Sequence, residues 1–190
     1  MSVERCRRFT LSDAMILVVA TAVGCGLIKW SGTDVVRLFD PDPRYKQSSF
    51  GGYLSSFVGG THYTVVPFLA SWSPAMVLIR MRTPRPSRRR LFRQPGVVAT
   101  SAATLAVAAE LFWFFASNFS GSGNNMRIFV AFAGWRAYCA FSVAGAWLTL
   151  SLSGRWRGET GWIDRIGSVL GFGWIACLLI YWLQHNFLRL

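Results

Sequence analysis

Two apolar stretches decide the fold of this chain: PGVVATSAATLAVAAELFWFFAS at 95–117 and IFVAFAGWRAYCAFSVAGAWLTL at 128–150. A short polar segment, 118–127, joins them, so they are expected to form an antiparallel transmembrane hairpin. Each stretch carries a single charge, Glu110 in the first and Arg136 in the second. At the helical rise of about 1.5 Å per residue, both charges lie roughly 12–13 Å from the turn. That depth is near the middle of a bilayer core about 30 Å thick.

A charge at this depth needs a partner or a water-filled cavity, because its insertion costs on the order of 2.5–3.5 kcal/mol. Opposite charges at one depth on adjacent helices supply such a partner, so the sequence predicts an intramembrane ion pair between Glu110 and Arg136. One interpretation is that the pair fixes the register of the two helices. The other is a proton or ion relay, or an anchor for a polar ligand, although Thr21 and Ser71 are the only modestly polar residues expected nearby.

The composition indicates a membrane protein rather than a soluble domain. Of the 190 residues, 53% are hydrophobic and only 15% are charged, and the mean hydropathy is +0.36. Soluble domains carry about 25% charged residues. The net charge of +12 does not indicate nucleic-acid binding, because the basic residues cluster between apolar segments rather than along one soluble face. No nucleic-acid partner is therefore expected.

The apolar segments predict an all-α fold, a single transmembrane domain over 1–190 that forms a bundle of five membrane-spanning helices. An outer loop at 31–56 and a basic cytoplasmic loop at 80–94 connect the first three spans. Pro67 and Pro74 should kink the second span on nearly the same face. The five predicted spans are about 13–28, 57–79, 95–117, 128–150 and 166–184.

Small residues recur at helical spacing in three of these spans, and such residues let helices approach closely in lipid. In the fifth span they form the motif Gly167-x-x-x-Gly171, which packs helices within a chain or between two copies. In the third and fourth spans they predict two packing faces, Ala99, Ala102, Ala103, Ala106 and Ala109 on one helix and Ala133, Ala137, Ala140 and Ala144 on the other.

The basic residues predict a cytoplasmic N-terminus and an outer C-terminus, in what we expect to be a bacterial inner membrane. The proposed inner segments hold three basic residues in the head, seven in the large loop and three after the fourth span, whereas outer positions hold six. The large loop should set topology, and it should also contact anionic lipid headgroups or a protein partner. Its arginines are Arg80, Arg82, Arg85, Arg88, Arg89, Arg90 and Arg93.

His62 and His185 are the only histidines, and both are predicted near the outer surface. They are candidate ligands for a haem or another pigment, or they lie unligated in an aromatic belt. No other cofactor and no metal are expected, because the cysteines lack C-x-x-C spacing and the outer-loop aspartates lack the spacing of an EF-hand. The segment 22–25, ending in Cys25, approximates a lipoprotein cleavage box.

The sequence contains no nucleophile elbow, P-loop, dinucleotide fingerprint or metalloprotease motif, so an enzyme is not expected. The leading hypothesis is a non-catalytic multi-pass membrane protein, an accessory or scaffolding subunit that binds lipid and other membrane subunits or itself. The alternative is a small transporter or ion-conducting subunit that uses Glu110 and Arg136. A third hypothesis is a haem- or pigment-binding subunit that uses His62 and His185.

Overall fold

A computed structural model describes residues 9–30, 50–82, 92–119, 125–156 and 161–187, and over 50–63 and 125–135 it describes the backbone only. The described residues form five α-helices and contain no strand. Each predicted span lies within one of these helices, so the all-α fold and the five-helix bundle are confirmed. The helices are α1 (Leu11–Trp30), α3 (Phe50–Met81), α5 (Pro95–Phe119), α6 (Asn125–Leu152) and α7 (Trp162–Phe187).

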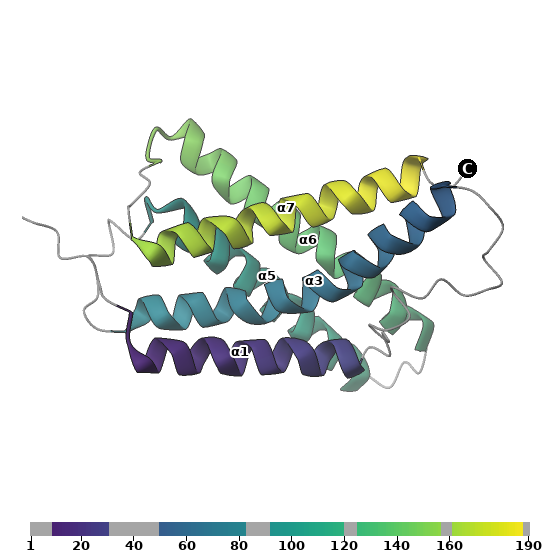
Figure 1. Ribbon diagram of the computed structural model, residues 1–190, viewed down its shortest axis with the longest axis horizontal. Coiled ribbons are helices and arrows are strands. Elements are labelled where there is room, and N and C mark those ends of the chain that lie inside the picture. Colours follow the sequence, from purple (N-terminus) through teal and green to yellow (C-terminus); the bar gives the residue numbers. More distant parts are fainter. Residues whose placement is uncertain (1–8, 31–49, 83–91, 120–124, 157–160, 188–190) are drawn as a thin grey trace, which may run out of the picture.

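Successive helices run in opposite directions (Figure 1). One end of the bundle therefore gathers the starts of α1, α5 and α7 together with the ends of α3 and α6, and we call it the Gln94 end after the residue that precedes α5. α5 packs most extensively against α6, and α7 packs against α3, α5 and α6. α1 lies at the edge of the bundle and packs mainly on α3.

The helix ends at the Gln94 end have local causes. α1 begins before its predicted start because Thr10 caps it: Asp13 N donates to Thr10 Oγ1 (3.3 Å), and Thr10 N donates to Asp13 Oδ2 (3.1 Å). α5 begins at Pro95 as predicted, since proline fits a first helical turn. α6 ends just before Gly154, which adopts a left-handed φ of 62° that glycine tolerates without strain.

The core of the bundle lies where α3, α5, α6 and α7 meet. Trp174 of α7 is its largest fully buried side chain, and Met76 and Ile79 of α3 are also fully enclosed. The two predicted alanine faces contribute as expected where their side chains are described, except that Ala109 is exposed. Figure 1 also shows that α3, which contains Pro67 and Pro74, changes direction partway along its length. The main buried members are Val66, Leu69, Ala70, Met76, Ile79, Ala99, Ala103, Cys139, Ala140, Val143, Trp147, Ile163, Leu170, Trp174 and Cys177.

Four helices are long and apolar enough to cross a membrane, over Leu11–Lys29, Thr64–Met81, Pro95–Trp113 and Trp162–Ile180. In α6 the side chains are described only from Arg136 onward, a stretch shorter than the about 20 residues of a crossing. The fourth predicted span is therefore not tested by this comparison of length and hydropathy.

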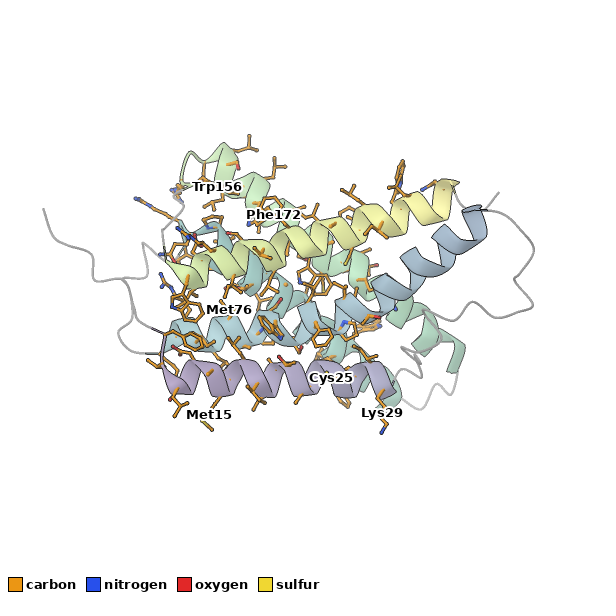
Figure 2. The ribbon with its side chains drawn as sticks, viewed as in Figure 1. Met15, Cys25, Lys29, Met76, Trp156 and Phe172 are labelled. Atoms are coloured by element: carbon orange, nitrogen blue, oxygen red, sulfur yellow. The ribbon has the colours of Figure 1, made fainter. Side chains whose placement is uncertain are left out.

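The outward faces of the helices carry large apolar side chains. On α5, Leu105 is 71% exposed and Phe112 is 74% exposed. Figure 2 shows Met15 and Lys29 of α1 pointing away from the other helices. Phe172 of α7 is 62% exposed, although its ring packs edge-to-face against Trp147 of α6. Soluble monomers seldom expose contiguous apolar surface of this extent, whereas such a surface is expected where lipid covers it.

Candidate functional site

A cluster of buried polar residues lies at the Gln94 end, where α3 ends and α5 begins. Gln94 is only 1% exposed although it precedes the helix. Its carbonyl accepts the first helical hydrogen bond of α5, from Val98 N (3.0 Å). Its side-chain Oε1 accepts a hydrogen bond from Nη2 of Arg80, the last basic residue of α3. A charged donor strengthens this bond, so the guanidinium ties the end of α3 to the start of α5.

The start of α5 is also tied to the start of α7. Asp164 is 4% exposed, and its Oδ1 accepts a hydrogen bond from Gly96 N (2.8 Å). That N–H belongs to the first turn of α5, where the helix itself offers no acceptor. The carboxylate therefore satisfies a buried donor and places a negative charge at the positive end of the α5 dipole.

This hydrogen bond requires glycine on both helices. A Cβ atom added at Gly96 would lie 2.2 Å from the backbone oxygen of Asp164, and one added at Gly167 would lie 2.6 Å from the backbone oxygen of Gly96. Both distances are far below van der Waals contact, so α5 and α7 reach their separation only because neither position has a side chain.

Gly171, the second glycine of the Gly167-x-x-x-Gly171 motif, packs against an aromatic ring. Trp147 of α6 lies over Gly171, where an added Cβ would come within 2.5 Å of the indole. The indole Nε1 of Trp147 donates to the carbonyl oxygen of Pro95 (2.8 Å). Gly167-x-x-x-Gly171 is therefore used inside the chain, against α5 and α6, and both glycines are buried. Of its two predicted roles, the structure shows packing within one chain.

Two further hydrogen bonds join helices through indole donors. Trp174 Nε1 of α7 donates to Ser73 Oγ of α3 (3.3 Å), and that hydroxyl in turn donates to Leu69 O (2.7 Å). Trp72 Nε1 of α3 donates to Thr21 Oγ1 of α1 (3.2 Å). Within the described residues, these polar groups of the spans thus bond neighbouring helices, and Thr21, predicted to lie near the intramembrane charges, joins α1 to α3.

Glu110 and Arg136, the predicted intramembrane pair, are both half-buried. Glu110 lies about 14 Å from the end of α5, and Arg136 about 17 Å from the start of α6, so their levels agree within about one helical turn. The ion pair itself stays a prediction.

The predicted basic loop divides into residues with different roles. Arg80 is half-buried and bonds Gln94, so it belongs to the bundle rather than to the exposed surface. Arg82 and Arg93 are exposed at the Gln94 end, as a contact with lipid headgroups requires. Arg85, Arg88, Arg89 and Arg90 lie outside the described residues.

The two histidines lie in helices, and their side chains are outside the described residues. α3 begins at Phe50, earlier than predicted, so His62 lies about 18 Å along the helix from its start. His185 lies about 3 Å from the end of α7. Ligation of one haem by two histidines is easiest at equal depth, which these positions do not favour, and a Soret band in the purified protein is the direct test. Among described residues, no group of three His, Cys, Asp or Glu side chains is arranged to hold a metal ion.

Sequence reasoning missed the roles of Gln94, Asp164 and Trp147. A signal existed for Gln94, because a proline that opens a helix makes the preceding residue its cap. A signal existed for Asp164 too, because an acid in a first turn suits the helix dipole. Their burial, and the choice of α5 as the partner of Asp164, depend on the packing of helices that are distant in sequence.

Comparison with known protein families, with curated proteins and with solved structures gives no match for this chain. Its class therefore follows from the fold itself: a five-helix bundle in which four helices are long and apolar enough to cross a membrane.

Proposed function

We propose that this chain is a non-catalytic integral membrane protein that acts as an accessory or scaffolding subunit of a membrane complex. The observation that supports this most directly is the use of its buried polar groups. Gln94, Asp164 and Ser73 each form a hydrogen bond between two helices. A catalytic or transport site needs polar groups that face a substrate, whereas these groups hold helices together.

The outward surface supports the same proposal. Phe112 of α5, Phe141 of α6 and Phe172 of α7 are each more than half exposed, on three different helices. Aromatic side chains are enriched in protein–protein interfaces, because they bury a large area with little loss of conformational freedom. A partner helix would replace lipid on one of these faces.

Site-specific photo-crosslinking in intact membranes tests this proposal. A photoreactive residue is introduced separately at Phe112, Phe141 and Phe172, and at the buried Trp174 as the matched control. We expect a discrete cross-linked protein from one face and none from Trp174. Lipid adducts alone at all three exposed positions, together with a bare monomer by native mass spectrometry in mild detergent, would overturn the scaffolding proposal.

We further propose that the Gln94 end faces the cytoplasm of a bacterial cell and that the membrane is its inner membrane. Support comes from Arg82, Arg93 and Arg155, which are exposed at this end, and from the predicted excess of basic residues in the connecting segments there. Reporter fusions decide the orientation. A C-terminal alkaline phosphatase should be active and a C-terminal green fluorescent protein dark, and the reverse result would overturn the assignment.

A small transporter is the second candidate function, because Glu110 and Arg136 are both half-buried and lie at similar levels along α5 and α6. Intramembrane charges commonly mark proton or ion pathways. If this chain conducts protons, liposomes containing it should dissipate an imposed pH gradient, Glu110→Gln should stop the flux, and Gly145→Ala should leave it unchanged. A leak equal to that of empty liposomes would overturn this candidate.

A further inference from the structure

We draw no further inference here: the strongest candidate, the buried polar cluster of Arg80, Gln94 and Asp164 at the Gln94 end, is made of hydrogen bonds between the chain's own helices, and the unsatisfied Nε2 of Gln94 is covered by protein atoms, so nothing in the structure shows a ligand that reaches it.

Discussion

Replacing Gly167 with alanine should destabilise the protein, because it forces α5 and α7 apart. The added Cβ would lie 2.6 Å from the backbone oxygen of Gly96 and 2.9 Å from its Cα. Neither atom can rotate away, since both belong to the backbone of a helix. Ordinary contact begins near 3.4 Å, so the two helices must separate locally by about 0.8 Å.

The cost has two parts. Overpacking of this kind costs about 1–3 kcal/mol. The same movement would stretch the hydrogen bond from Gly96 N to Asp164 Oδ1 from 2.8 Å to about 3.6 Å, beyond useful length, with a loss of about 1 kcal/mol. The better helix propensity of alanine offsets about 0.5–1 kcal/mol. The net loss is about 2 kcal/mol, which corresponds to a fall of about 4–8 °C in the thermal midpoint for a chain of this size.

Thermal unfolding in detergent, followed by tryptophan fluorescence, measures this change. Gly145→Ala on α6 is the matched control, because an added Cβ there would have no atom of the described residues within 4 Å, and its midpoint should stay the same or rise slightly. Size-exclusion chromatography of Gly167→Ala should show an unchanged oligomeric state. If Gly167→Ala unfolds within 1 °C of Gly145→Ala, or changes only the oligomeric state, the assignment of this glycine motif to packing within the chain is wrong.

Three further predictions concern single contacts. Trp147→Phe removes the hydrogen bond to Pro95 and also the indole carbons Cζ2 and Cη2 that lie over Gly171, so stability should fall by about 1–3 kcal/mol in the same thermal assay. Asp164→Ala leaves the Gly96 N–H without its acceptor and should cost about 1–3 kcal/mol, whereas Asp164→Asn, which retains an oxygen, should cost less. If Glu110 and Arg136 pair, Glu110→Arg and Arg136→Glu should each lower the free energy of unfolding by about 3–5 kcal/mol. The yield of folded protein should therefore fall for each single reversal, and the double reversal should restore it.

Each of these predictions has a result that contradicts it. A wild-type midpoint for Trp147→Phe would show that neither the indole hydrogen bond nor the packing of the indole on Gly171 contributes measurably. Equal losses for the two Asp164 variants would mean that the oxygen facing Gly96 is unimportant. Failure of the double reversal to rescue both single reversals would argue against an ion pair between Glu110 and Arg136.

Part of the candidate site could be predicted from the sequence. The lengths of the apolar segments and of their connecting turn predict that Glu110 and Arg136 lie at one level on neighbouring helices. Their distances from the facing ends of α5 and α6 differ by less than one helical turn. The sequence did not distinguish Arg80, which forms a hydrogen bond inside the bundle, from the other arginines named in its loop. Its contact with Gln94 depends on where α3 ends relative to α5, which no local pattern specifies.

Hydrophobicity over about twenty residues requires a helix in lipid, because every backbone polar group must be satisfied within the segment. For this reason the sequence by itself determined the all-α class and the five helices. The start of α5 was determined by Pro95, because proline fits a first helical turn. Only the tertiary structure decided which helix faces Gly167, because any apolar helix with small residues can accept that motif. α5 is the partner because it supplies contacts that exist only in the folded bundle. The Gly96 backbone packs on Gly167, the Gly96 N–H donates to the Asp164 carboxylate, and the Pro95 carbonyl accepts from the Trp147 indole.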